Sequence, residues 1–157
     1  MKIAVAFDHR GITLRAAVIG ELVTQGHDVL DLGTDQPSPK VDYPDKSYEL
    51  AETILDGRAE RGILVCSSGV GVVIAANKIA GIRACLCHDP YTAHQGVEHD
   101  AMNVLCLGSE VVGIALVPEI VRAFVSAEFI GGGRYARRLE KLATLERGEP
   151  LTEEMPA

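Results

Sequence analysis

One stretch of the sequence decides the fold, and it reads Val65-Cys66-Ser67-Ser68-Gly69-Val70-Gly71-Val72-Val73-Ile74-Ala75-Ala76-Asn77-Lys78. The short apolar run that ends at Cys66 predicts a buried strand. From Val70 onward, small and apolar residues continue as far as Ile79, and Gly81 then ends the run. This second pattern predicts a buried helix. The stretch therefore predicts a strand that turns directly into a helix.

The turn between these two elements has the composition of an anion-binding site. Serine and glycine let the backbone come close to a ligand and direct free N–H groups toward it, with the positive end of the helix dipole behind them. Cys66 stands at the end of the strand, where a helix N-terminus favours a thiolate. Two roles follow for this turn. The thiol can act as an acid or base, and the amides of residues 68–72 can stabilise an oxyanion.

Other interpretations of the same turn stay open. A cysteine at the end of a buried strand is often only a small core residue. The stretch is not a P-loop, because Lys78 lacks the required spacing from a second glycine, and Ile74 occupies the third-glycine position of a dinucleotide fingerprint. The glycine pattern alone is therefore a weak signal.

Composition limits the possible classes of protein. A chain of 157 residues that is 47% hydrophobic suits one compact domain. Its net charge of −7 argues against nucleic acid or an anionic membrane as a partner. The chain enters a strand at once and has no apolar run of membrane-spanning length, so we expect a cytoplasmic protein. The spacing of its four cysteines indicates neither a zinc site nor a disulfide framework.

Strand and helix patterns alternate along the chain, which predicts βαβ units and a parallel sheet. The expected fold is a doubly wound, Rossmann-like three-layer αβα sandwich with five parallel strands. Such sheets bind ligands outside the carboxyl ends of their strands, and Asp8-His9, Cys66 with its turn and His88-Asp89 all follow predicted strands. The predicted strands span residues 2–7, 29–32, 63–66, 82–87 and 103–107, and the predicted helices span 12–24, 45–56, 70–79, 91–97, 111–129 and 134–147.

The C-terminal part of the chain has a different character. The glycines at 131–133 predict a hinge that lets the last helix leave the domain, so we divide the chain into a domain at 1–130, a hinge and helix at 131–147, and a flexible tail at 148–157. Arg134 and Arg138 share one helix face and could form a phosphate clamp, although ordinary solvated arginines would follow the same pattern.

His99 is expected in the loop before the fifth strand. From there its side chain reaches the carboxyl edge of the sheet only if the loop folds back or if the side chain enters the site of a neighbouring subunit.

Several motifs, taken together, resemble the ribose-5-phosphate isomerase B family, which includes the galactose-6-phosphate isomerase subunits. The resemblance extends from residue 1 to about residue 146. The motifs that carry it are Asp8-His9, Asp42-Tyr43-Pro44, Cys66 with the Gly-x-Gly turn, Ile74-Ala75-Ala76-Asn77-Lys78, Gly81-Ile82-Arg83-Ala84, His99 with Asn103, Gly108 with Val111-Val112-Gly113, and Gly132-Gly133-Arg134 with Arg138.

The resemblance implies an aldose–ketose isomerase that works through a cis-enediolate without metal or cofactor. Cys66 resembles the base that moves the proton, and His99 resembles the acid that opens the sugar ring. Ribose 5-phosphate is the expected substrate, which would place the chain in the pentose phosphate pathway. The resemblance also implies a homodimer with shared active sites, and leaves pairing into tetramers open. The implied substrate-binding residues are Asp8, His9, Ser67, Ser68, Gly69, Val70 and Gly71, with Arg134 and Arg138 given by the partner subunit.

The sequence departs from the family pattern at two positions. Asp100 stands where Asn is usual, and Tyr135 stands where His is common. An ionised Asp only accepts hydrogen bonds, so we expect Asp100 to contact substrate and to change or broaden substrate preference. One branch of the family has Glu at the position of Val72 and lacks Cys66, so this chain falls in the cysteine branch. A hexose 6-phosphate, a tetrose phosphate, a non-catalytic phosphometabolite-binding module and a cysteine-nucleophile transferase remain alternatives.

Overall fold

The computed structural model describes residues 1–151, and within them five parallel strands form one sheet in the order β2-β1-β3-β5-β4. The doubly wound sheet expected from the sequence is confirmed. Its strands are β1 (Lys2–Phe7), β2 (Asp28–Asp31), β3 (Arg61–Cys66), β4 (Ala84–Leu86) and β5 (Val104–Gly108). Its helices are η1 (Gly11–Leu14, a 3₁₀ helix), α1 (Arg15–Thr24), α2 (Tyr43–Leu55), α3 (Val70–Ala76), α4 (Pro90–Asp100), α5 (Val117–Ser126) and α6 (Gly133–Glu146).

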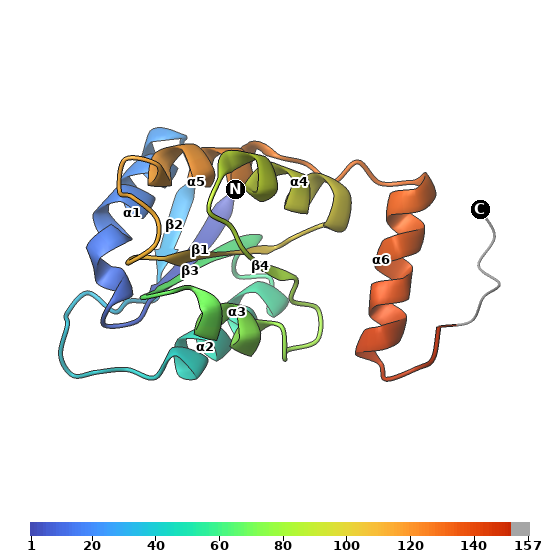
Figure 1. The fold of residues 1–157 in the computed structure, drawn as a ribbon, viewed down its shortest axis with the longest axis horizontal. Coiled ribbons are helices and arrows are strands. Elements are labelled where there is room, and N and C mark those ends of the chain that lie inside the picture. The colour runs from blue at the N-terminus through green and yellow to red at the C-terminus, as the bar shows by residue number, and fades with distance from the viewer. Residues whose placement is uncertain (152–157) are drawn as a thin grey trace.

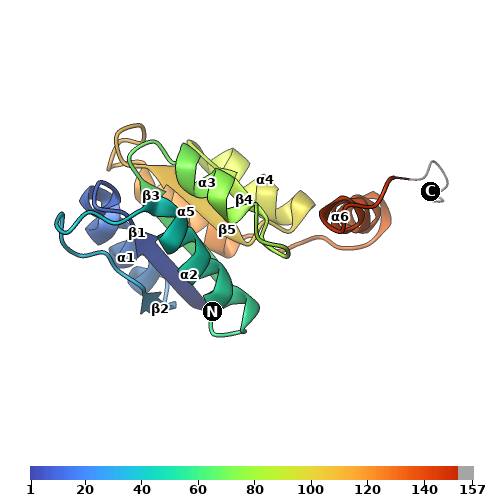
Figure 2. The ribbon, with the colours of Figure 1, turned by 90° about the horizontal axis from the view of Figure 1, so that it is seen from below.

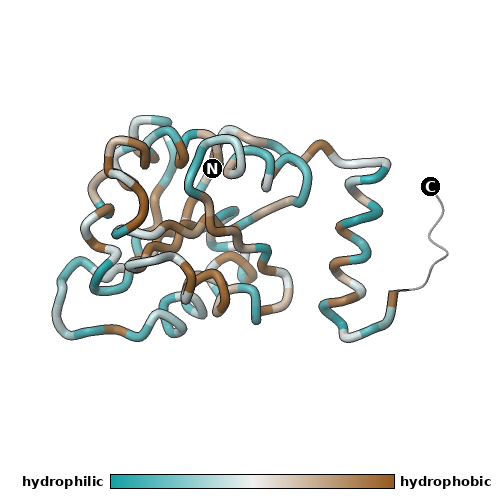
Figure 3. The backbone as a smooth tube through the Cα atoms, viewed as in Figure 1, coloured by the Kyte–Doolittle hydropathy of each residue, from teal (hydrophilic) through white to brown (hydrophobic). Residues whose placement is uncertain are grey.

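Helices cover both faces of the sheet, as Figures 1 and 2 show. Alternate residues of β1 point to opposite faces, so Val5 packs with α1, α4 and α5 while Ala6 packs with α2 and α3. After the first residues Lys2 in β1 and Arg61 in β3, the central strands are apolar (Figure 3), as expected of parallel strands buried on both faces. The two apolar layers hold the sheet in place, so its carboxyl edge is a rigid platform.

The order of the strands defines a topological switch point. From β1 the chain moves outward to β2 on one side and then returns to β3 on the other side of β1. In open α/β sheets, ligands bind at the carboxyl ends of the strands where the winding reverses. Asp8 follows β1 and Cys66 ends β3, so two predicted site residues lie side by side at this point.

The predicted helix over residues 111–129 is wrong in its first part, because α5 begins only at Val117. Pro118 lies in the first turn, where a backbone N–H would have no acceptor within the helix, so proline costs no hydrogen bond there. The preceding residues form turns instead, in which the amides of Val111 and Val112 both donate to the carbonyl oxygen of Gly108. Pro118 therefore starts the helix and does not kink it.

Helix α4 is longer than the predicted helix at 91–97 and carries His99 and Asp100 in its last turn, so these residues are not in a loop. Asp89 caps its N-terminus by accepting from the amide of Thr92 at 2.8 Å. Ala101 ends the helix in the left-handed conformation, with φ of 51°. Because α4 runs back from the carboxyl edge, this helix ends at the amino edge of the sheet.

Helix α6 stands beside the domain instead of packing into it (Figure 1). None of its residues is buried, although its sequence is strongly amphipathic, as the alternating colours of Figure 3 show. Gly131 and Gly132 before it and Gly133 at its start all have positive φ, at 67°, 69° and 48°. The predicted tail at 148–157 lies largely outside the described residues.

The close approach of the β1–η1 turn to β3 gives a test of the fold. A Cβ at Gly11 would lie 2.1 Å from the carbonyl oxygen of Val65. We expect Gly11→Ala to destabilise the protein by about 1–3 kcal/mol, since neither backbone can move freely. Gly20→Ala is the matched control, because no atom lies within 4 Å of its new Cβ and alanine favours a helix by about 0.5–1 kcal/mol. Urea unfolding followed by circular dichroism measures both, and equal stabilities for the two variants would contradict the close packing.

Candidate active site

The thiol of Cys66 lies at the end of β3, 4% exposed, directly beneath the serine-glycine turn. The amide N–H of Gly69 donates to its sulfur at 3.0 Å. The turn is also held from the neighbouring strand, because the amides of Ser109 and Glu110 donate to the carbonyl oxygens of Cys66 and Ser67 at 2.8 and 2.9 Å. The predicted juxtaposition of thiol and amides is therefore present.

Gly69 makes this turn possible. It adopts φ of 80° and begins α3, and a Cβ there would lie 2.3 Å from Cδ1 of Leu86 and 3.0 Å from the carbonyl carbon of Leu107. Only glycine fits such a backbone so close to two strands. The amides of Val70 and Gly71 then lie in the first turn of α3, where they have no acceptor within the helix, and the Val70 amide donates to Oγ of Ser68 at 3.3 Å.

Asp8 and His9 lie next to this turn, as predicted. The buried carboxylate of Asp8 accepts from the amides of Arg10 and Gly11 at 2.8 and 2.7 Å, which fixes the loop after β1. Nδ1 of His9 donates to the carbonyl oxygen of Val41 at 3.3 Å. Since a carbonyl oxygen can only accept, this contact leaves Nε2 of the neutral ring as an acceptor.

The remaining predicted site residues form a second cluster on α4 and α6. The ring of His99 stacks on Tyr135 with 4.7 Å between ring centroids, and its Nε2 lies 3.5 Å from the carboxylate of Glu98. Arg134 lies over the same tyrosine ring at 4.8 Å and donates to its hydroxyl at 2.7 Å. Arg138 is exposed one turn further along α6. Tyr135 thus connects the predicted acid to the predicted clamp.

These two clusters are separated within one chain. Cys66 lies at the carboxyl edge of the sheet and His99 near the amino edge, so the length of β3 separates them by roughly 16 Å. The structure therefore brings together Asp8, His9, Cys66 and residues 67–71, but not His99, Asp100, Arg134 or Arg138 with them.

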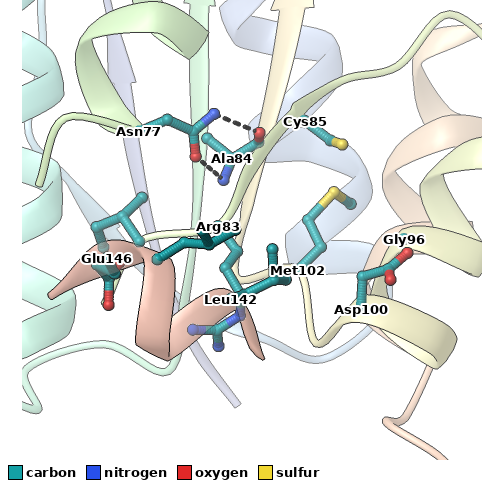
Figure 4. A pocket seen from close by; sticks show the side chains of 11 residues that line it. Asn77, Arg83, Ala84, Cys85, Gly96, Asp100, Met102, Leu142 and Glu146 are labelled. Atoms are coloured by element: carbon teal, nitrogen blue, oxygen red, sulfur yellow. Dashed lines mark hydrogen bonds between the residues drawn. The ribbon is translucent and has the colours of Figure 1, made fainter. Parts of the chain in front are cut away.

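Asp100 lines a cavity of about 430 Å³ between α6 and strand β4 (Figure 4). Arg83, Cys85 and Met102 border it from the body, and Leu142 borders it from α6. This cavity lies away from Cys66, and its walls are mainly apolar. The cavity therefore lies where α6 faces the rest of the domain, and Cys66 is not among the residues that line it.

Two residues of the carboxyl edge were not singled out from the sequence. Arg10 and Glu110 follow the ends of β1 and β5, and Nη1 of the arginine donates to the carboxylate at 3.3 Å. Both residues follow predicted strands, and this position alone could have indicated from the sequence that they lie at the carboxyl edge of the sheet. By contrast, Asp89 after β4 caps α4, and its carboxylate accepts from both the amide and the hydroxyl of Thr92.

Within residues 1–151, no three His, Cys, Asp or Glu side chains converge on a point that could hold a metal ion. In the same part of the chain, no helix combines the length and hydropathy needed to span a bilayer.

The fold and this site define a class, a doubly wound α/β protein with a thiol set in a serine-glycine turn. The Ribose/Galactose Isomerase family model matches residues 3–142, and the chain belongs to this family. The family and the isomerase class expected from the sequence are thus confirmed.

Individual relatives agree with this assignment. Ribose-5-phosphate isomerase B of Escherichia coli (strain K12) is 42% identical over 146 residues, covering 93% of this chain and 97% of the relative. D-erythrulose-4-phosphate isomerase of Pectobacterium atrosepticum is 40% identical over 149 residues, covering 95% and 97%. Ribose-5-phosphate isomerase B of Mycoplasma genitalium, solved with bound ribulose-5-phosphate, superposes with a TM-score of 0.85 at 38% identity, covering 93% of this chain and 96% of that one.

A second thiol, that of Cys85 in β4, gives a test of the local geometry. The hydrogen bond from the Cys87 thiol lowers the pKa of Cys85 to about 7, although partial burial opposes this shift. Because the thiolate is the reactive form, alkylation of exposed Cys85 by iodoacetamide should accelerate as pH rises through 7 and then level off. Peptide mass spectrometry measures the rate. In Cys87→Ala the midpoint should move upward, and an unchanged midpoint would refute the role of the hydrogen bond.

Proposed function

We propose that the chain interconverts ribose 5-phosphate and ribulose 5-phosphate, with Cys66 as the base. The observation that carries this proposal is the Cys66 sulfur held 3.0 Å from a backbone amide within a turn of further amides. The ribose-5-phosphate isomerases B among its relatives support the choice of substrate. This reaction would place the chain in the pentose phosphate pathway.

The geometry suits proton transfer between neighbouring carbons. In the open-chain aldose, the Cys66 thiolate removes the proton from C2, and the carbonyl oxygen on C1 takes the negative charge. The resulting cis-enediolate carries its charge on oxygens that the amides of residues 67–71 can reach, which is the usual arrangement for oxyanion stabilisation. Return of the proton to C1 and transfer of the O2 proton to O1 complete the ketose. Asp8 and His9 bind the hydroxyl and phosphate groups beside this turn.

We further propose that a homodimer completes the site, because His99, Arg134 and Arg138 belong to the cluster that lies far from Cys66 in the same chain. In this arrangement the partner's cluster faces the thiol. His99 acts in opening the furanose ring, and the arginines bind the phosphate.

Exposed apolar surface supports a partner at these places. On α3, Val70 and Ile74 are 47% and 56% exposed and share one face beside the site. On α6, Leu142 and Leu145 are 45% and 53% exposed. A lone amphipathic helix of this length gains little stability without a surface to bury its apolar face. A second copy that covers α3 and α6 would bury both faces and bring the clusters together.

The Pectobacterium relative favours a tetrose phosphate as the second candidate substrate. Asp100 lies in the last turn of α4, next to His99. In the proposed dimer, Asp100 would therefore approach the thiol site of the other subunit together with His99. There its carboxylate would favour substrates that offer a hydroxyl donor. A panel of four-, five- and six-carbon aldose phosphates ranks these candidates.

The base assignment makes a direct prediction. With ribose 5-phosphate in deuterated water, wild-type protein should form ribulose 5-phosphate that carries deuterium at C1, as observed by NMR. Cys66→Ala should lower kcat by about 10²–10⁴-fold, since positioned acid–base groups contribute that much, while substrate affinity changes only a few-fold. Cys106→Ala, which removes a core thiol, is the control. Near-normal turnover in Cys66→Ala would exclude the thiol as base.

The shared site is tested by mixing two inactive proteins. One is Cys66→Ala, and the other is Arg134→Ala/Arg138→Ala. After subunit exchange, a mixed dimer would contain one intact thiol site facing one intact arginine pair, so part of the wild-type activity should return. Native mass spectrometry establishes that exchange has occurred. If mixed dimers form and remain inactive, the arginines serve their own subunit.

A further inference from the structure

The pair Arg10–Glu110 crosses the end of the strand that carries the thiol. Arg10 follows β1 and Glu110 follows β5, and β3 lies between these strands in the sheet. The turn after β1 bends toward β3, since a Cβ at Gly11 would lie 2.1 Å from the carbonyl oxygen of Val65, and the amide of Glu110 contacts Ser67 from the β5 side. The observed contact of 3.3 Å between Arg10 and Glu110 therefore lies at the end of β3, beside Ser67.

Backbone contacts hold both residues in this position. The hydroxyl of Ser109 donates to the carbonyl oxygen of Arg10 at 3.0 Å, and the amide of Glu110 donates to the carbonyl oxygen of Ser67 at 2.9 Å. The carboxylate of Asp8 accepts from the amide of Arg10. The ends of β1, β3 and β5 are thereby joined, so the guanidinium is carried on a rigid part of the site.

We propose that Arg10 binds the substrate phosphate from the same subunit as Cys66, and that Glu110 limits how strongly it does so. This inference rests on the proposed function. The guanidinium offers five N–H donors, and the bond to Glu110 uses only Nη1. Its remaining donors can pair with phosphate oxygens in the bidentate manner that this planar group favours.

Glu110 acts in opposition because its charge has the same sign as the phosphate. Its carboxylate both competes for the guanidinium and repels the approaching dianion. The two side chains are 60% and 63% exposed, so water weakens each effect without removing it. The carboxylate of Glu110 thus lowers the affinity of Arg10 for a phosphate group. Glu110 is therefore a residue that determines the affinity of the site for the phosphate end of the substrate.

The test compares Arg10→Ala and Glu110→Gln in the full-length protein. Calorimetry with inorganic phosphate measures affinity without turnover, and ribose 5-phosphate kinetics give KM and kcat. We expect Arg10→Ala to weaken phosphate binding and raise KM about tenfold with kcat within about twofold. Glu110→Gln keeps an acceptor for Nη1 but loses the charge, so both constants should improve by about threefold.

A second exposed pair provides matched controls. Arg58 and Asp56 lie 3.7 Å apart before β3, at the amino edge of the sheet. Arg58→Ala and Asp56→Asn make the same changes in net charge, so they separate a local contact from the field of the whole protein. Both should leave phosphate affinity and KM unchanged.

Each outcome decides the inference. Unchanged constants in Arg10→Ala, effects equal to those of the controls, or a Glu110→Gln protein that binds phosphate no better than wild type would overturn it. If wild-type protein isomerises no sugar phosphate, the proposed function fails, yet calorimetry with inorganic phosphate still tests the cation. If isomerisation occurs and Arg10→Ala behaves as wild type, only the present inference fails.

Discussion

The contact on which the rest of the site depends is the close approach of Gly69 to the ends of β4 and β5. Its left-handed backbone passes so close to Leu86 and Leu107 that no side chain fits. This passage turns the chain sharply enough for the amide of Gly69 to meet the sulfur of Cys66, and it begins α3 at that point. The position of the thiol, the direction of the amides and the start of the helix are therefore consequences of one packing constraint.

The second constraint is topological. Because β3 lies between β1 and β5, residues from three distant segments meet at one edge. Asp8 fixes the first segment, and the amides of Ser109 and Glu110 fix the third to the turn. These bonds give the site a rigid half. The cluster of His99, Tyr135 and Arg134 lies near the other edge of the sheet, where α4 meets α6, a helix with no buried residue.

The distribution of charge follows the same division. The protein is acidic overall, with a net charge of −7, so binding of a phosphorylated sugar depends on where its arginines lie. At the thiol edge the cation Arg10 is paired with Glu110, whereas Arg134 and Arg138 are exposed on α6. In the proposed dimer, the exposed arginines of one subunit would add positive charge to the thiol site of the other subunit, where Arg10 is paired with Glu110.

The sequence by itself determined the class of fold and the rigid half of the site, since strand periodicity, glycine spacing and strand-end residues are local properties. Asp8, His9, Cys66 and the turn at 67–71 could be predicted together for this reason. It did not determine the start of α5, because the apolar residues 111–116 resemble a helix until packing assigns them to turns. Nor could it place His99 on a helix end. Only the tertiary structure decided the order of the strands, and with it the meeting of Arg10 and Glu110 across 100 residues, because contacts between distant segments arise from the packing of whole elements.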